Sequence, residues 1–366
     1  MWLIVNAGSS SLKLKVFEGE REVAKAFVGE IGPDGHAAAM AEGLAQAGVA
    51  VSRLTAAAHR VVHGGSGLTA TCRVTAAVLR QIEACVPLAP LHNPANLVGL
   101  QAVAALASDL PQYAAFDTAF HATNPEVAVS YALPKSERDR GLRRYGFHGI
   151  SYAALVRVLA TRGPLPARML ACHLGNGCSL AAIVNGRSVA TTMGYSPLDG
   201  LTMGTRAGGI DGNAVLRLAE LHGITGAGRI LNRESGLLGL GGASDLRALH
   251  AAGTPEARFA LDHFAYWAVR HAGSMVAAMG GLDAVVFTGG IGENDSWMRK
   301  EILSGLGYLG VSSDPDRNAR NETTLHDATS SVVILVVPAD EERQIALEAQ
   351  AVMSGEARGP RAGEGA

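Results

Sequence analysis

A strand–turn–strand pattern at the start of the chain returns about halfway along it, and this repeat constrains the fold most. Trp2 to Val5 is rich in β-forming residues, Ala7 to Ser11 has the composition of a turn, and Leu12 to Phe17 alternates like a half-buried strand. The second copy runs from Met169 to Val184 around Gly175-Asn176-Gly177. Two such units opening two halves of one chain predict an α/β fold with a duplicated domain.

The remaining segments carry the patterns of helices and buried strands. Helices are predicted at 94–108, 263–279 and 341–353, and further strands at 282–288 and 332–337. We therefore expect an N-terminal lobe of residues 1–146, joined by the helix at 341–353, and a C-terminal lobe of residues 147–340 that carries the nucleotide site, with the linker near 142–149. Residues 355–366 hold Gly, Pro and charge without periodicity, so we expect them to be disordered.

Composition excludes several classes of protein. With 48% apolar and 17% charged residues, the 366-residue chain can bury a large core. Its formal net charge of -2 gives no basic field for nucleic acid or an anionic membrane, so any anion must be bound locally. No signal segment or long apolar run is evident, and the four cysteines form no CxxC pair, so we expect reduced thiols in a cytoplasmic protein.

Glycine-rich turns are the candidate phosphate sites. The chain has no GxxxxGK[ST] segment, and the GxGxxG match at Gly305 follows a helix-like segment rather than a strand, which favours a surface turn. Turns at Gly8 to Ser11, Gly175 to Gly177 and Gly289 to Gly292 follow strands instead. Their backbone N–H groups can approach an anion closely. Each turn alone is more typical of a plain hairpin, but three of them in one chain favour phosphate binding.

Isolated charged groups form a second set of candidates. Arg60, His148 and Arg206 each lie among glycine, aromatic or apolar residues. An arginine there can bind carboxylate or phosphate with two parallel bonds, although a structural ion pair remains an alternative. Asp117 and Glu341 each follow an apolar run, where a carboxylate can hold Mg²⁺ or cap a helix.

Nine blocks in a fixed order carry a family resemblance. They read VNAGSSSLK, HRVVHGG, PLHNPANL, FDTAFH, RRYGFHGISY, CHLGNGCSL, SPLDGLTMGTRAGGIDG, VFTGGIGEN and VPADEE. In this order the chain resembles the acetate and propionate kinases. The resemblance implies duplicated actin/hexokinase-like (ribonuclease H-like) domains with a central cleft, a homodimer, and reversible Mg²⁺-dependent (or Mn²⁺-dependent) phosphoryl transfer between ATP and acetate that gives ADP and acetyl phosphate.

Matched position by position, the resemblance implies a role for each of a set of residues. The magnesium-associated residues would be Asn6 and Glu341, and the catalytic residues Arg60, Asp117, His148 and Arg206, with Arg60 also contacting substrate. ATP would be bound by Lys13, His173, Leu174, Gly175, Asn176, Gly177, Asp245, Leu246, Arg247, Gly290, Ile291, Gly292, Glu293 and Asn294. The acyl group would lie against Val62, Leu91, Phe147 and Pro197.

The sequence also departs from the family pattern. The usual TRSGDIDP reads here from Thr205 to Gly212 as TRAGGIDG, and the segment before Asp245 has one serine rather than two. Propionate as substrate, pyrophosphate as phosphoryl donor, and a non-catalytic nucleotide-binding sensor stay open as alternatives. Because a carboxylate nucleophile carries no proton near neutral pH, Asp117 is expected to position groups rather than act as a base.

Overall fold

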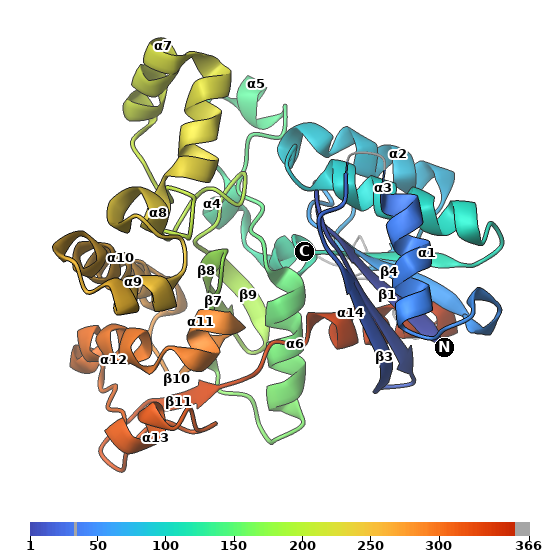
Figure 1. Cartoon of the computed structure of the whole chain (residues 1–366). Helices are drawn as coiled ribbons and strands as arrows, with labels where there is room; N and C mark the ends of the chain where they lie inside the picture. Colours follow the sequence, from blue (N-terminus) through green and yellow to red (C-terminus); the bar gives the residue numbers. More distant parts are fainter. Residues whose placement is uncertain (33–34, 356–366) are drawn as a thin grey trace. The chain divides into compact units, whose positions relative to one another are not determined.

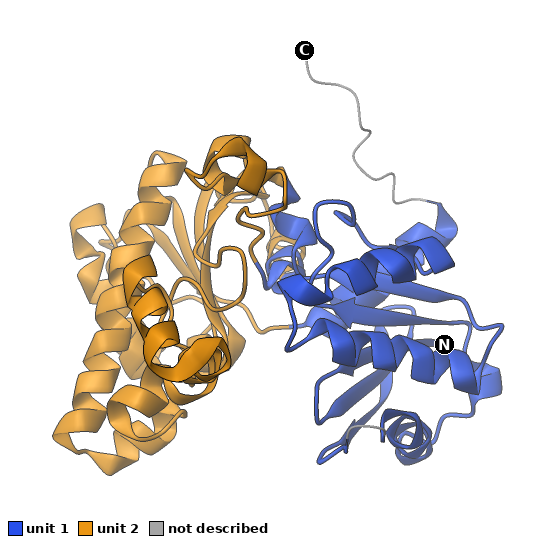
Figure 2. Cartoon of the chain, turned by 90° about the horizontal axis from the view of Figure 1, so that it is seen from above, with its two compact units in different colours: residues 1–122, 147–154, 340–366 blue, residues 123–146, 155–339 orange. Residues whose placement is uncertain are grey.

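The computed structural model describes residues 1–32 and 35–355, which form two compact units (Figure 2). Unit 1 contains residues 1–122, 147–154 and the segment from 340 onward, and unit 2 contains residues 123–146 and 155–339. Between residues 146 and 147 the chain passes from unit 2 to unit 1, and between residues 154 and 155 it passes back to unit 2. The assignment of the lobes as folding domains stays a prediction.

Unit 1 is built on a mixed sheet. Its strands are β1 (Trp2–Ala7), β2 (Leu12–Glu18), β3 (Arg21–Val28), β4 (Ala56–Val61), β5 (Cys72–Arg73) and β6 (Gln112–Phe116). They lie in the order β3-β2-β1-β4-β6-β5. The first three strands form an antiparallel meander, whereas β1, β4 and β6 run parallel. The two strands predicted around the Gly8 turn are therefore present and paired.

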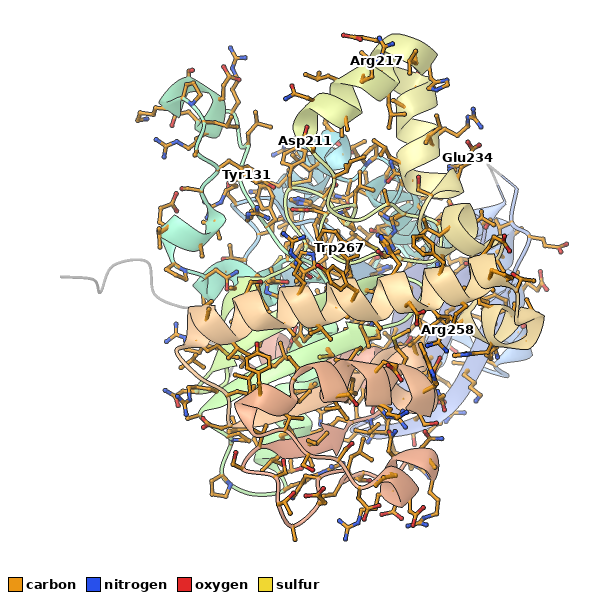
Figure 3. All side chains as sticks on the ribbon, turned by 90° about the vertical axis from the view of Figure 1, so that its left-hand side faces the viewer. Tyr131, Asp211, Arg217, Glu234, Arg258 and Trp267 are labelled. Atoms are coloured by element: carbon orange, nitrogen blue, oxygen red, sulfur yellow. The ribbon has the colours of Figure 1, made fainter. Side chains whose placement is uncertain are left out.

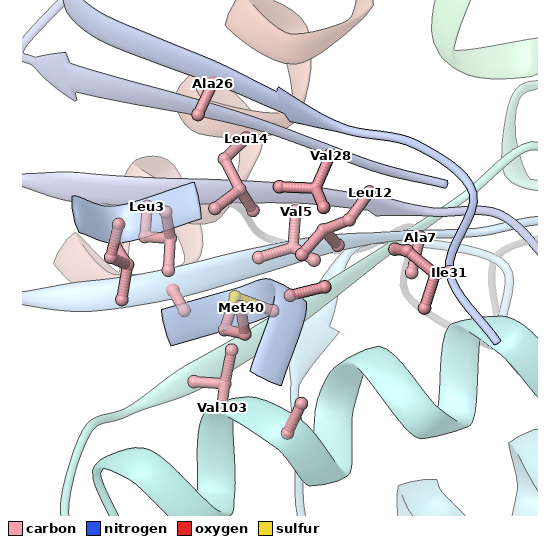
Figure 4. Close-up of a cluster of buried hydrophobic side chains, with 14 of the residues drawn as sticks. Leu3, Val5, Ala7, Leu12, Leu14, Ala26, Val28, Ile31, Met40 and Val103 are labelled. Atoms are coloured by element: carbon pink, nitrogen blue, oxygen red, sulfur yellow. The ribbon is translucent and has the colours of Figure 1, made fainter. Parts of the chain in front are cut away.

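Helices cover both faces of this sheet (Figure 1). They are α1 (His36–Gln46), α2 (Ala76–Ala84), α3 (Asn93–Leu106), the first part of α6 (Gly149–Ala160) and α14 (Glu341–Ser354). On one face, Leu12 and Leu14 alternate inward and pack with Met40 of α1 and Val103 of α3 (Figure 4). On the other, α14 packs Ile345 against Ile4. The apolar alternation of β2 thus assigns Lys13 and Lys15 to the face that α14 covers.

Unit 2 repeats the same strand arrangement. Its strands are β7 (Arg168–Leu174), β8 (Cys178–Val184), β9 (Arg187–Thr191), β10 (Ala284–Thr288) and β11 (Val333–Val336). Their order, β11-β10-β7-β8-β9, again joins an antiparallel meander to two strands parallel to its first member. In this order β7, β8, β9, β10 and β11 correspond to β1, β2, β3, β4 and β6. The duplicated α/β fold expected from the two glycine turns is confirmed.

The helices of unit 2 include the longest one described. They are α4 (Glu126–Val129), α5 (Lys135–Arg138), the rest of α6, α7 (Gly212–Arg229), α8 (Gly236–Gly241), α9 (Leu246–Ala252), α10 (Pro255–Met279), α11 (Gly289–Asn294), α12 (Ser296–Gly305) and α13 (Pro315–Ala319). Helix α10 packs on β7, β8 and β9 and begins eight residues before the predicted start at His263. The reason is local: Thr254 caps the N–H of Ala257, and Pro255 occupies the first helical turn.

Several smaller expectations can also be compared with the structure. The GxGxxG match forms a 3₁₀ turn, Gly307–Leu309, directly after α12 rather than after a strand. All four cysteines lie in the described part of the chain and are free. Of the segment expected to be disordered, Gly355 ends α14 and residues 356–366 lie outside the described residues. No described helix has both the length and the apolar character needed to cross a bilayer.

Candidate active site

The parallel strands of unit 1 bring three predicted site residues to one edge of the sheet. Val5 of β1 pairs with His59 of β4, so Asn6 and Arg60 are the next residues along neighbouring strands. Asp117 follows β6 directly, and its N–H donates to the carbonyl of Val61 at 3.1 Å. The carboxyl ends of adjacent parallel strands thus place an amide, a guanidinium and a carboxylate side by side.

Arg60 and Asp117 form an ion pair with two hydrogen bonds. Arg60 Nε lies 3.0 Å from Asp117 Oδ1, and Nη2 lies 2.6 Å from Oδ2. Glu341, at the start of α14, brings Oε2 to 4.0 Å from Arg60 Nε. Burial alone would lower the pKa of Arg60, but the charges of Asp117 and Glu341 outweigh it and raise that pKa. Arg60 therefore stays a fixed cation whose plane is set by Asp117.

His148 lies in a constrained loop that is anchored to Asp117. Its φ of 59° is in the left-handed region, which is uncommon for a residue other than glycine. The next residue, Gly149, donates its N–H to the Asp117 carbonyl at 2.7 Å. A Cβ at Gly149 would lie 2.3 Å from that carbonyl oxygen, so only glycine fits. Asp117 thus connects the three predicted catalytic residues of unit 1: its side chain binds Arg60, and its carbonyl binds the residue after His148.

Two buried asparagines that the sequence analysis gave no role support this edge. Asn93 accepts the N–H of His63 at 3.1 Å and donates to its carbonyl at 3.0 Å. Asn96 accepts the N–H of Val62 at 3.0 Å and donates to the carbonyl of Ala7 at 2.9 Å. Both asparagines lie inside the PLHNPANL block. Two polar residues on the buried face of a predicted helix were the sequence signal that could have indicated this supporting role.

The acyl-pocket residues of unit 1 differ in exposure. Val62 and Phe147 are buried, whereas Leu91 is 43% exposed. The Phe147 carbonyl accepts a hydrogen bond from His121 at 2.9 Å, and the Phe147 ring meets His63 edge-on at 5.4 Å between centroids. Val62 and Phe147 are therefore rigidly placed apolar surfaces.

Lys13 forms an ion pair with Glu342, which was not predicted as a site residue. Glu342, beside Glu341, places Oε1 2.5 Å from Lys13 Nζ and Oε2 3.4 Å from Lys15 Nζ. Burial would raise the pKa of Glu342, but the hydrogen bond from Lys13 and the charges of both lysines lower it below its usual value. Asp340, which precedes the helix, caps no N–H with its side chain. The VPADEE block thus contributes Glu341 and Glu342 to the site rather than a helix cap.

Asn6 and Glu341 have the chemistry that Mg²⁺ requires. Both offer hard oxygen donors, and Glu341 lies beside Arg60, the strand neighbour of Asn6. In the described chain no three His, Cys, Asp or Glu residues gather as a metal cluster. Mg²⁺ is commonly held by one or two protein oxygens together with phosphates and water. The donor set therefore fits an ion that is bound together with nucleotide.

In unit 2, the ends of β7 and β10 bring two predicted ATP segments together. Gly289 has a φ of 80°, and a Cβ there would lie 2.7 Å from the Leu174 carbonyl oxygen. Glu293 accepts the N–H of Gly289 at 3.0 Å and that of Ala339 at 2.9 Å. Asn294 donates to the carbonyl of Gly290 at 2.9 Å. The segments at 173–177 and 290–294 thus meet at one sheet edge.

Arg206 is held in a loop that lies against the same edge. Gly204 donates its N–H to the Asn176 carbonyl at 3.4 Å, and Met203 donates to the Arg206 carbonyl at 3.2 Å. The guanidinium donates from Nη1 to the carbonyl of Pro197 at 2.6 Å. Within the described residues it forms no ion pair, and burial lowers its pKa, with Cys178 acting in the opposite direction. Arg206 is therefore a half-buried cation that lacks an anion.

The loop after Arg206 is firmly closed despite its departures from the family pattern. Gly209 donates to the Gly200 carbonyl at 2.9 Å, and Ala207 donates to the Leu231 carbonyl at 3.0 Å. Asp211, labelled in Figure 3, caps α7 by accepting the N–H groups of Asn213 and Ala214. Backbone bonds and the Asp211 cap thus fix this loop in the absence of the family's serine, acid and proline.

The third predicted ATP segment has two exposed charged residues, Asp245 and Arg247, on either side of the buried Leu246. Asp245 caps α9, and its carboxylate also binds the Arg247 guanidinium at 3.1 and 2.7 Å. Hydrogen bonds from Arg247 lower the pKa of Asp245 to about 2. Ser244 lies near Gly204, because a Cβ on Gly204 would lie 3.0 Å from the Ser244 carbonyl oxygen. This segment therefore adjoins the Arg206 loop.

The predicted residues divide between the two units. Unit 1 holds Asn6, Lys13, Arg60, Val62, Leu91, Asp117, Phe147, His148 and Glu341. Unit 2 holds His173, Leu174, Gly175, Asn176, Gly177, Pro197, Arg206, Asp245, Leu246, Arg247, Gly290, Ile291, Gly292, Glu293 and Asn294. Unit 1 holds the acid-bound cations, and unit 2 holds the glycine turns.

Comparison with known proteins places these residues in a family. The model of the acetokinase family matches residues 36–347. The acetate kinase of Rhodopseudomonas palustris is 41% identical, with 94% of this chain and 96% of the relative covered. The crystal structure of Porphyromonas gingivalis acetate kinase matches with a TM-score of 0.88 and 34% identity over 96% of this chain and 99% of that one. A propionate kinase from Francisella tularensis matches with a TM-score of 0.87 and 34% identity, over 95% of this chain and 98% of that one. The chain belongs to the acetokinase family.

Proposed function

We propose that this protein is an acetate kinase that transfers the γ-phosphoryl group of ATP reversibly to acetate. The relatives named acetate kinase are similar along nearly the whole chain, and the cationic, glycine-rich groups of both units suit an anionic donor and acceptor. The observation that carries the proposal is Arg206, a half-buried guanidinium that among the described residues forms no ion pair. Such a group is stabilised by an anionic ligand such as phosphate.

The proposed reaction exchanges one P–O bond for another. A carboxylate oxygen of acetate forms a bond to the γ-phosphorus while the bond from that phosphorus to the β,γ-bridging oxygen breaks, and ADP leaves with the electron pair. In-line transfer of this kind spreads charge over the equatorial oxygens. Arg206 and His148 would donate to those oxygens, and Arg60, held in plane by Asp117, would orient the acetate carboxylate.

Asp117 supports this transfer without accepting a proton. Acetate is ionised near neutral pH, so attack requires no general base. Both carboxylate oxygens of Asp117 already accept bonds from Arg60. Its role is to fix the direction of the guanidinium.

Each unit has candidate nucleotide-binding residues of its own. Lys13 would contact phosphate, the turns at 173–177 and 290–294 would offer backbone N–H groups, and Asp245 to Arg247 would lie toward the adenosine. Asn6 and Glu341 would hold Mg²⁺, or Mn²⁺, whose charge offsets that of the phosphates when it is bound. Val62, Leu91, Phe147 and Pro197 would enclose the methyl group of acetate.

A hydroxamate assay tests the function directly. Hydroxylamine traps acetyl phosphate as acetohydroxamate, so the wild-type protein is expected to form it from acetate and Mg-ATP. Parallel reactions with pyrophosphate in place of ATP, and with propionate in place of acetate, test the other donor and the other acid. Arg206→Ala is the inactive control. A wild-type protein that binds ATP yet forms no hydroxamate with either donor would be a nucleotide-binding sensor instead.

Two further properties belong to the same proposal. A homodimer is expected from the family resemblance, and sedimentation equilibrium of the intact chain measures it. A cytoplasmic location is expected from the sequence, and fractionation of the native cells tests it.

A further inference from the structure

Four charged side chains gather on the face of the first sheet that α14 covers. Lys13 and Lys15 project from β2 on this face, Glu342 enters it from the first turn of α14, and Glu22 follows on β3. Glu342 contacts Lys13 at 2.5 Å through Oε1 and Lys15 at 3.4 Å through Oε2. Lys15 also contacts Glu22 at 2.9 Å. One carboxylate thus has two ammonium partners, one on each oxygen.

The two members of the Lys13–Glu342 pair differ in their access to water. The Lys13 side chain is 48% exposed, whereas that of Glu342 is 7% exposed. Lys13 can therefore turn away and remain solvated. Glu342 cannot follow it or gain a comparable water shell, and a buried charge left without a partner is costly.

Lys15 can keep the buried Glu342 carboxylate paired when Lys13 turns away. It is two residues from Lys13 on the same strand, so both side chains lie on one face of the sheet. Only 17% of its side chain is exposed, which keeps its ammonium beside Glu342. Lys15 also forms an ion pair with Glu22, and this pair holds the Lys15 ammonium in place when Lys13 moves away.

We propose that Lys13 exchanges between Glu342 and the nucleotide phosphates, and that Lys15 keeps the Glu342 carboxylate paired while Lys13 is engaged. This inference rests on the proposed function, in which Lys13 contacts the nucleotide. Glu342 and Lys15 are accordingly positioning residues, because they act through Lys13. Their effect falls on nucleotide affinity rather than on the chemistry of transfer.

Lys15→Met tests the exchange without altering Lys13. With Lys15 gone, engagement of the nucleotide by Lys13 leaves Glu342 buried and unpaired, so ADP affinity measured by calorimetry is expected to fall about tenfold. The KM for ATP should rise in parallel while the KM for acetate stays unchanged. Lys25→Met is the matched control. Lys25 lies opposite Lys15 on the neighbouring strand β3, but it forms no ion pair in the described chain. It should bind ADP like the wild type.

Glu342→Gln provides the second arm. It removes the carboxylate that competes for Lys13, so ADP should bind several-fold more tightly than to the wild type. In Lys15→Met/Glu342→Gln the penalty of Lys15→Met should disappear, because no buried carboxylate remains to be left unpaired. Thermal unfolding of each variant verifies that it is folded at the assay temperature.

The outcomes separate this inference from the proposed function. If Lys15→Met binds ADP as tightly as Lys25→Met, or if Glu342→Gln weakens ADP binding and the double variant is no better than Lys15→Met, the exchange is wrong. If the wild type itself forms no acetohydroxamate and binds no ADP, the proposed function fails first. A wild-type enzyme that is active alongside an unaffected Lys15→Met contradicts the exchange alone.

Discussion

Asp117 holds the guanidinium of Arg60 by two of its nitrogen atoms, Nε at 3.0 Å and Nη2 at 2.6 Å. The same residue anchors the loop of His148, because its carbonyl accepts the N–H of Gly149 at 2.7 Å. Its side chain and its backbone therefore fix two different candidate catalytic residues. An acid in this position is an organiser of the site.

Replacing Asp117 by Asn is expected to lower kcat/KM for acetate, since an amide can accept at only one oxygen and leaves Arg60 less firmly oriented. The shape of the pH–rate profile near neutral pH should stay that of the wild type, because no proton is removed from acetate. Steady-state kinetics over a pH series measure both. Loss of an ionisation from the profile of the variant would assign Asp117 a role as base.

Arg206→Ala is expected to lower kcat by about 10³–10⁵-fold, as for other arginines that stabilise a phosphoryl-transfer transition state. Its effect on ATP affinity should be small, because the charge it meets develops during transfer. Arg217→Ala is a suitable control, since Arg217 is exposed on α7 (Figure 3) and among the described residues forms an ion pair only with its helix neighbour Glu220. A near-normal kcat for Arg206→Ala would remove this residue from the mechanism.

Gly149→Ala should disturb the site through packing alone. The added Cβ would lie 2.3 Å from the Asp117 carbonyl oxygen, so one of the two backbones must move. We expect a loss of about 1–3 kcal/mol in the free energy of unfolding and a lower kcat. Gly228→Ala, where a Cβ meets open space, is the control. Urea unfolding compares the two, and equal stabilities would show that the loop yields freely.

Buried histidines are expected to make unit 1 sensitive to acid. Burial lowers the pKa of His59 and His121 to about 4, against an ordinary value of 6.5. Between these values the unfolded chain binds more protons than the folded one, so stability is full above pH 6.5 and falls as the pH drops toward 4. Each histidine can contribute up to about 3 kcal/mol to this loss.

His121→Gln checks the effect, because glutamine can still donate to the Phe147 carbonyl but cannot be protonated. Urea midpoints measured through this pH window should fall less steeply for the variant than for the wild type. Parallel curves would mean that His121 is protonated in the folded state.

Val62→Ala tests the acyl pocket. Removing the buried side chain makes room for a longer acid, so the ratio of kcat/KM for propionate to that for acetate should rise. One methylene in an apolar pocket changes binding by about 1–3 kcal/mol, which limits the shift to roughly 10–200-fold. A ratio equal to that of the wild type would place the acyl group elsewhere.

Local sequence patterns were sufficient to predict the main strands that carry the candidate site residues. The alternation of Leu12, Leu14 and Val16 predicted β2, and the repeated glycine turns between strands predicted the duplicated α/β fold. The start of α10 was placed too late because the Thr254 cap and Pro255 were not weighed against the apolar pattern.

The partners of each site residue could not be predicted in the same way. Asn96 reaches Ala7 across 89 positions in the chain, and Glu342 reaches Lys13 only after α14 has packed on the sheet. Such contacts depend on register between distant strands, which a single sequence does not specify. The pairing of Arg60 with Asp117 is of this kind. The lack of an ion pair at Arg206 within the described residues likewise depends on which side chains the fold brings near it.

Helix α14 also bears on how the protein is made. One face of the first sheet, which holds Ile4 and Ala58, is covered by Ile345, Ala346 and Ala349 of α14. Strand β1 is translated first, whereas α14 is translated after every residue of unit 2. The ribosome must therefore synthesise the second unit completely before the first can bury this surface. The nascent chain would carry an open apolar sheet throughout that interval, a natural target for chaperones.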